Sequence, residues 1–159
     1  MRRKDKTINE QAAIDALLAE VNIGRLGTNG PGGPMIKPVN FVYLNGAFYF
    51  HSATEGEKIG HIMADSRVVF QVERVLEYIS AEGKPCGANQ AYECVIARGK
   101  AVIVEDPQEC MSALNALMGK HQPEGGFAPL TAKMLGGVAV VRVDVEEMTA
   151  KASPARASK

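Results

Sequence analysis

The sequence has no excess of charge of either sign and no long hydrophobic run. Its 159 residues carry 18 Lys and Arg against 18 Asp and Glu. Balanced charge provides no basic field for a polyanion, so we expect no nucleic-acid partner. No apolar run approaches the roughly 20 residues of a membrane-spanning helix, and the first residues lead into a polar segment rather than a signal peptide. We therefore expect no membrane partner.

Cysteine is scarce, and no two cysteines form a C-x-x-C pair. The three cysteines are Cys86, Cys94 and Cys110. This odd, scattered set excludes a disulfide framework and favours a reducing cytoplasm. The histidines, His51, His61 and His121, have no metal-ligand spacing with the cysteines, so no metal site is expected. The helix over residues 55–64 is predicted to carry Ile59, Ile62 and Met63 inward and His61 on its surface. Strand alternation is expected to bury Cys94 as an inert thiol.

Short segments with strand alternation dominate what is present. Strands are predicted over residues 22–28, 35–44, 47–52, 67–73, 92–105 and 138–147, and helices after residue 7 and over residues 55–64 and 107–118. Residues 74–91 are expected to form a long loop, and Gly99 a bulge or bend. Connections of these lengths predict a mainly β (α+β) fold: a six-stranded antiparallel barrel with peripheral helices. We expect one domain over residues 1–148 and a flexible tail over residues 149–159.

A hairpin around Asn45-Gly46 is the clearest local feature, because this dipeptide favours a two-residue turn. The register of such a turn places Asn40 opposite His51 on one face of the sheet. The opposite face collects a core stripe of Val39, Phe41, Tyr43, Phe48 and Phe50.

The second strand of this hairpin leads into a helix whose start is rich in polar groups. Thr54 with Glu57 fits a capping box, as Thr7 with Glu10 does before the first helix. Free N–H groups at a helix start, together with Lys58, can bind an anion, and Gly56 allows close approach. The alternative is an ordinary capped surface helix with a solvated lysine. The local sequence leaves both interpretations open.

Five segments, taken in order and spacing, resemble one known superfamily. They are "GRLGT", "PVNFVYLNGAFYFHSATEGEKIGHI", "RVVFQVE", "YECVIARGKAVIVED" and "VAVVRVDVEEMTAK". The pattern resembles the pyridoxamine 5'-phosphate oxidase-like flavin-binding split-barrel superfamily, and within it the branch of nitroimidazole-resistance reductases. The resemblance implies a homodimer of six-stranded split barrels with two FMN molecules at the dimer interface.

The resemblance also implies a set of FMN contacts: Lys37, Pro38, Val39, Asn40, Phe41, His51, Ser52, Ala53, Lys58, Ile59, Tyr92 and Cys94. In this arrangement the strand of residues 37–41 runs along the flavin ring, residues 51–53 line the ribityl phosphate, and Lys58 clamps the phosphate. Tyr92 and Cys94 come from a strand of the other subunit.

One further absence narrows the activity that the resemblance implies. A true pyridoxamine-phosphate oxidase needs an Arg-rich C-terminal motif with tryptophan, and this chain has no Trp. We expect instead an FMN-dependent oxidoreductase that reduces a small substrate, such as a nitroaromatic compound, with electrons from a separate donor. His51 is either its proton donor or a cofactor contact. The alternative is a non-catalytic flavin- or haem-binding protein, with His121 or His51 as axial ligand; deazaflavin is a weaker possibility.

Overall fold

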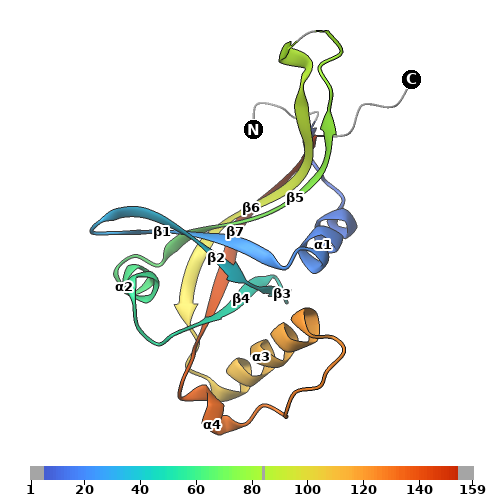
Figure 1. The fold of residues 1–159 in the computed structure, drawn as a ribbon. Helices are drawn as coiled ribbons and strands as arrows, with labels where there is room; N and C mark the ends of the chain where they lie inside the picture. The colour runs from blue at the N-terminus through green and yellow to red at the C-terminus, as the bar shows by residue number, and fades with distance from the viewer. Residues whose placement is uncertain (1–5, 84, 154–159) are drawn as a thin grey trace.

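In the part of the chain that the structure describes, seven strands form a single antiparallel sheet in the order β2-β1-β5-β6-β7-β4-β3 (Figure 1). The structure is a computed structural model that describes residues 6–83 and 85–153. The strands are β1 (Ile23–Gly30), β2 (Gly33–Asn40), β3 (Val42–Leu44), β4 (Ala47–Ser52), β5 (Arg67–Ile79), β6 (Asn89–Ile103) and β7 (Ala139–Ser153). The sheet curls strongly, with β2 and β3 as its two free edges. The predicted mainly β, antiparallel split barrel is confirmed.

Among the described residues, four α-helices lie at the margins of the sheet: α1 (Gln11–Glu20), α2 (Glu57–Ala64), α3 (Pro107–His121) and α4 (Ala132–Leu135) (Figure 1). A 3-10 turn, Pro85–Gly87, lies between β5 and β6. Helix α3 packs against β3 and β4, so β4 is covered on both faces and Ala47–Phe50 are all buried. In the described part of the chain, no helix has both the length and the apolar character needed to cross a bilayer.

The predicted strand over residues 35–44 is divided at Phe41. Its first part, β2, pairs with β1, and its second part, β3, pairs with β4, so the sheet has seven strands rather than six. The division follows from burial of Phe41, whose ring is fully enclosed. The centroids of the Phe41 and Phe70 rings are 5.3 Å apart.

The hairpin register is confirmed at Val42↔Tyr49, but the ladder ends there. Positive φ at both Asn45 and Gly46 fits the predicted turn. The predicted pairing of Asn40 with His51 is wrong, because Asn40 pairs with Ile23 and His51 with Val140.

Strands β5, β6 and β7 are longer than predicted. The expected loop over residues 74–91 is largely strand, because β5 continues to Ile79 and β6 begins at Asn89; the two form the arm at the top of Figure 1. Strand β7 continues to Ser153, so residues 149–153 are not a tail, while residues 154–159 lie outside the described residues. Side chains of the arm such as Val75 (64% exposed) are not buried, so they do not hold the arm together by packing. The arm is held together by backbone pairing between β5 and β6.

The ladder between β6 and β7 is irregular at Gly99, where a bulge or bend was predicted, but the extra residue is Glu146 of β7, because Arg98 pairs with Glu147 and Gly99 with Val145. A Cβ atom at this position would lie 1.9 Å from the carbonyl oxygen of Asp144. The two backbones therefore approach as closely as they do only because residue 99 has no side chain.

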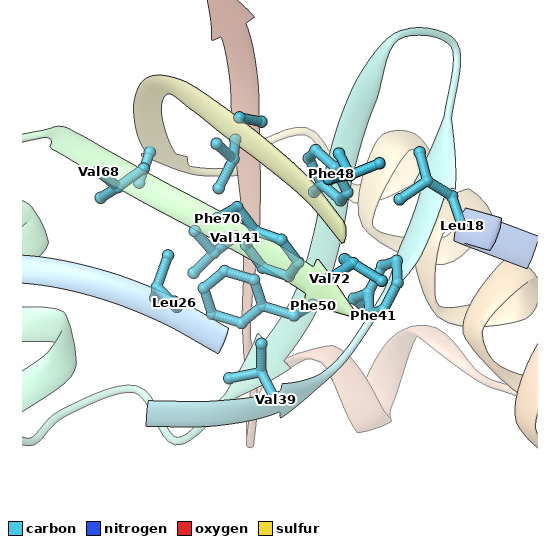
Figure 2. Packing of buried hydrophobic residues seen from close by; sticks show 14 of the residues in the cluster. Leu18, Leu26, Val39, Phe41, Phe48, Phe50, Val68, Phe70, Val72 and Val141 are labelled. Carbon is cyan, nitrogen blue, oxygen red and sulfur yellow. The ribbon is translucent and has the colours of Figure 1, made fainter. Parts of the chain in front are cut away.

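The core lies in the concavity of the sheet and is centred on phenylalanine rings (Figure 2). Phe48 stacks on Phe70 with ring centroids 4.4 Å apart. Helix α1 contributes Leu17 and Leu18, which are essentially inaccessible to solvent. Each member of the predicted core stripe is buried or packs against this cluster, as alternation along the hairpin predicted.

Both predicted capping boxes are wrong. Helix α1 begins after Glu10, and Thr7 instead forms an isolated bridge with Lys151. Helix α2 begins after Gly56 rather than at residue 55, and no side chain caps it. In both places the residue that precedes the helix is not the predicted cap: it is Glu10 rather than Thr7 before α1, and Gly56 rather than Thr54 before α2.

Helix α2 buries a different face from the one predicted. Ile59 and Ile62 are buried as expected, but Met63 is 76% exposed. His61, expected on the surface, is buried, and its Nδ1 shares a 3.1 Å hydrogen bond with the hydroxyl of Thr28. This contact joins positions far apart in the sequence, so helical periodicity alone could not predict it.

Candidate functional site

The edge strand β2 provides the first element of the candidate site. It pairs only with β1, and an edge strand leaves every second residue with N–H and C=O groups that have no sheet partner. Strand β4 is similar at its end, because residues 50–52 pair with β7 alone, whereas β3 reaches only Tyr49. Strands β2 and β4 approach each other without hydrogen-bonding, so two unpaired backbone edges border the same part of the barrel.

The start of α2 adds charge beside these edges. Gly56 precedes the helix with φ of 116°, a conformation that favours glycine. Lys58 is half-buried in the first turn, with its Nζ 5.3 Å from the centroid of the Phe50 ring. Burial and the neighbouring ammonium of Lys37 both lower the pKa of Lys58. Lys37 itself is paired with Glu57 at 3.6 Å.

Lys58 makes no hydrogen bond or ion pair with the described residues, in contrast to Lys37. A half-buried ammonium beside a second ammonium is poorly compensated. A phosphate group would supply the missing negative charge and would also accept hydrogen bonds from N–H groups at the start of α2. This pair of lysines is the strongest candidate for anion binding in the described chain.

His51 and Asn40 lie on the other side of the strand pair, where they line one cavity of about 280 Å³. They share this cavity although they are not a cross-strand pair. Both are exposed, and the imidazole of His51 makes no hydrogen bond with the described residues. His121, from the end of α3, also lines the cavity, and its Nε2 donates to the carbonyl oxygen of Phe41 at 3.1 Å. This hydrogen bond therefore connects the break between β2 and β3 to the end of α3.

The remaining predicted FMN contacts on β2, β4 and α2 fall into two groups, one buried and one accessible to solvent. The side chains of Val39, Phe41 and Ile59 face the core and are at most 7% exposed, so they can offer a ligand backbone atoms only. Pro38 and Ala53 are exposed, and Ser52 is half-buried.

Tyr92 and Cys94 lie apart from these groups, on the outer face of β6. They line a separate groove of about 450 Å³ together with Lys151. Cys94 is half-buried rather than buried, because it is Val95 that faces the core. Burial, followed by the nearby carboxylate of Glu73, raises the pKa of the Cys94 thiol. A single chain does not bring this groove together with Lys58.

Sequence reasoning missed Lys120, which lies next to His121. Its Nζ donates to the carbonyl oxygens of Leu18 and Val21 at 2.8 Å each and lies 3.7 Å from the centroid of the Phe41 ring. Burial lowers the pKa of Lys120 to about 8. A basic residue near the end of a helix is a weak signal, and partners about 100 positions away could not be read from it.

Comparison with known proteins decides the family. The family model described as Pyridoxamine 5'-phosphate oxidase matches residues 10–152. The chain belongs to this family. Among curated proteins, none matches the sequence significantly.

Solved structures agree with this family assignment. A proposed 5-nitroimidazole antibiotic resistance protein from Bacteroides thetaiotaomicron is 25% identical, with a TM-score of 0.79 over 92% of this chain and 86% of its own. A flavocytochrome from Azotobacter vinelandii is 16% identical, with a TM-score of 0.84 over 100% of this chain and 75% of its own. An FAD and haem binding protein from Mycobacterium smegmatis is 14% identical, with a TM-score of 0.85 over 97% of this chain and 76% of its own. The last two show a shared fold alone.

Proposed function

We propose that this chain is an FMN-dependent oxidoreductase that reduces a small substrate, such as a nitroaromatic compound, at a flavin bound between two subunits. The observation that carries the proposal is the approach of Lys37, on the edge strand β2, to Lys58, in the first turn of α2. The similarity to a proposed 5-nitroimidazole resistance protein supports the substrate class.

The residues present fit a flavin mononucleotide. Lys58 and Lys37 would hold the phosphate, and the backbone groups that β2 leaves without a sheet partner on its free edge match the donors and acceptors of a flavin's polar ring edge; Pro38 would offer its C=O alone, because it has no N–H. When bound, the flavin supplies electron transfer, and the protein supplies position and electrostatics. Donors along β2 would stabilise negative charge on the reduced ring.

His51 would act at the boundary between cofactor and substrate. It is exposed, its imidazole has no hydrogen-bond partner among the described residues, and it is the next-to-last residue of β4, shortly before the turn to α2. An imidazole can hold or release a proton near neutral pH. We assign it first to cofactor contact and second to proton donation.

The proposal includes a homodimer, because Tyr92 and Cys94 can reach the flavin only from a partner subunit. The outer face of the sheet suits such an interface. Ile36 and Val69 both pair with Gly27 from opposite sides, so their side chains flank a glycine on one face, and they are 69% and 39% exposed. A partner side chain can lie over the glycine, where a groove of about 530 Å³ is present.

A second candidate, a flavin- or haem-binding protein without turnover, is favoured by the fold it shares with the flavocytochrome. Extraction of the cofactor from purified protein, followed by mass spectrometry, separates these possibilities. We expect FMN. Recovery of FAD or a deazaflavin would contradict the FMN assignment, and a Soret band with extracted haem would favour the second candidate.

Turnover is tested with His51→Ala and His51→Gln. If His51 donates the proton in a rate-limiting step, we expect His51→Ala to retain FMN and to reduce substrate roughly 10²–10⁴-fold more slowly. His51→Gln would then lose the limb of the pH–rate profile near neutrality. Loss of flavin from both variants would make His51 a cofactor contact alone.

The dimer is tested by sedimentation of Ile36→Glu, with Met63→Glu as a control at a similarly exposed methionine of α2. We expect dimers for wild type and the control and monomers for Ile36→Glu. A wild-type monomer with bound flavin would contradict the interface. The cytoplasmic location stays a prediction.

A further inference from the structure

The cavity at the end of α3 has a wall that is almost entirely apolar. Its volume is about 280 Å³. Side chains of α3 and of the segment leading through α4 form this wall: Leu114, Leu117, Met118, Leu130, Met134 and Val138. Such a wall excludes water from one side of any bound molecule and favours an apolar ligand.

The polar groups of the cavity are gathered where the two strands end. Asn40 comes from the last position of β2, His51 from near the end of β4, and His121 from the last position of α3. The described residues that line the cavity include no Asp, Glu, Lys or Arg. Because a charged ligand would find no opposite charge there, the cavity suits a neutral one.

These groups offer hydrogen-bond donors to a ligand. The amide of Asn40 can both donate and accept. The imidazole of His51 has no partner among the described residues, so its N–H is available. His121 uses Nε2 on the carbonyl of Phe41, which holds its ring at the cavity rim. A ligand with an acceptor at one end would satisfy Asn40 and His51 together.

Volume limits the size of the ligand. An apolar cavity of roughly 150 Å³ accommodates benzene. A cavity of about 280 Å³ therefore accommodates one aromatic ring with a small substituent. We therefore expect a fused three-ring system, such as a flavin ring, to be too large for this cavity.

The outer wall of the cavity is open enough for entry. Met134 of the four-residue helix α4 is 47% exposed while lining the cavity. Gly125 and Gly126, both at positive φ, lie in the segment between α3 and α4. The outer wall is therefore formed by Met134, an apolar residue on the short helix α4, which follows the long connection from α3.

We infer that this cavity binds neutral, single-ring aromatic compounds that carry a hydrogen-bond acceptor, with the ring between α3 and α4 and the acceptor at Asn40 and His51. Its use as the pocket for the second reactant rests on the proposed function, because Asn40 and His51 border both the cavity and the proposed flavin strand.

Binding is tested with the full-length protein as purified and three probes that are not substrates of a nitro reduction. Acetophenone has one ring and an acceptor, ethylbenzene has the same shape without the acceptor, and 9-acetylanthracene has the acceptor on three fused rings. Binding is followed by NMR of labelled methionine methyl groups. We expect acetophenone to shift the methyl signals of Met118 and Met134 with a Kd of roughly 1 mM or lower. The exposed methyl of Met63 should not respond.

The acceptor and the size limit give separate expectations. Ethylbenzene should bind roughly 2–10-fold more weakly than acetophenone, the value of about one hydrogen bond. 9-Acetylanthracene should not shift the cavity signals. Equal binding of all three probes, or no shift at Met118 and Met134 at 10-fold the expected Kd, would overturn the inference.

A matched pair of variants locates the site. Met134→Trp fills the cavity from a half-exposed position, and Met63→Trp places the same side chain on α2. We expect only Met134→Trp to weaken acetophenone binding, by roughly tenfold or more, with unchanged thermal unfolding. Unchanged binding in Met134→Trp would contradict the inference.

FMN affinity, measured on the same samples by flavin fluorescence, keeps this inference separate from the proposed function. Normal FMN binding without probe binding would overturn the cavity assignment alone. Probe binding by a protein that binds no flavin would support the cavity and overturn the proposed function.

Discussion

Lys58 at the start of α2 and Lys120 at the end of α3 have similar surroundings but different partners. Both are half-buried, both lie near a phenylalanine ring, and burial lowers the pKa of both. Lys120 donates to the carbonyl oxygens of Leu18 and Val21 at the end of α1, as a basic C-terminal cap does. Lys58 has no such acceptor among the described residues and lies near Lys37.

This difference separates a structural charge from a binding charge. The ammonium of Lys120 is satisfied by the protein, so its burial stabilises the junction of α1 and α3. The ammonium of Lys58 has no such acceptor among the described residues, and on the proposed function a phosphate would supply one; poorly compensated charges of this kind cluster at functional sites. The proposal therefore gives the same residue type, at similar burial, two roles that its acceptors decide.

The largest effect is expected from Lys58→Ala, on cofactor affinity. Loss of a charge-assisted contact of about 1.5–3 kcal/mol should weaken FMN binding roughly 10–150-fold. Stability of the apoprotein should hardly change. Riboflavin, which lacks the phosphate, should bind wild type and variant similarly in a fluorescence titration.

Lys133→Ala, which removes an exposed lysine of α4, is the matched control and should leave both affinities unchanged. Equal losses of FMN and riboflavin affinity in Lys58→Ala would mean that Lys58 does not hold the phosphate.

Lys120→Met should have the opposite profile. It keeps an apolar stem but leaves the carbonyls of Leu18 and Val21 without their donor, so we expect a loss of about 1–2 kcal/mol in the free energy of unfolding. FMN affinity should stay within twofold of wild type. Urea denaturation of the apoprotein measures the first quantity. A variant of wild-type stability with weakened FMN binding would reverse the assigned roles.

The pH dependence of stability should also distinguish Lys120. Burial lowers its pKa from 10.5 to about 8, so between these values the unfolded chain binds more protons than the folded one. The contribution of Lys120 to the free energy of unfolding therefore increases as the pH rises from about 8 to 10.5. Because the lysine is only half-buried and its two carbonyl partners favour the charged form, we expect a gain on the order of 1 kcal/mol.

The difference between wild-type and Lys120→Met urea midpoints, from pH 7.5 to 9.5, isolates this contribution. The raised pKa of the Cys110 thiol affects both proteins equally. A pH-independent difference would show that Lys120 stays charged throughout.

The smallest effect is expected from Lys37→Ala. Its side chain is 47% exposed and already paired with Glu57, so its contribution to phosphate binding should be roughly 2–5-fold. The same titration with FMN and riboflavin measures it. A loss larger than that of Lys58→Ala would make Lys37 the principal phosphate ligand.

Features that depend on nearest neighbours were predictable. The Asn45-Gly46 turn and the buried faces of Phe48 and Phe50 follow from turn chemistry and from alternation along a strand. The irregularity at Gly99 was also predictable, because a glycine within a long strand indicates a close backbone approach. These features were confirmed.

Features that depend on distant partners were not predictable. The break at Phe41 arises because β1 pairs with one side of the former strand and β4 with the other. The arm of β5 and β6 continues without an apolar pattern because backbone pairing alone extends it. Both predicted capping boxes failed because side-chain patterns at a helix start do not fix where the helix begins.

The position of Lys58 and His51 close to the end of an aromatic strand follows from their order along the chain, so it could be predicted. What those groups face depends on how the chain folds. It brought Lys37 beside Lys58, and His121 to the carbonyl of Phe41. Charge compensation and hydrogen bonding act through space, so the role of each polar group depends on neighbours that folding supplies.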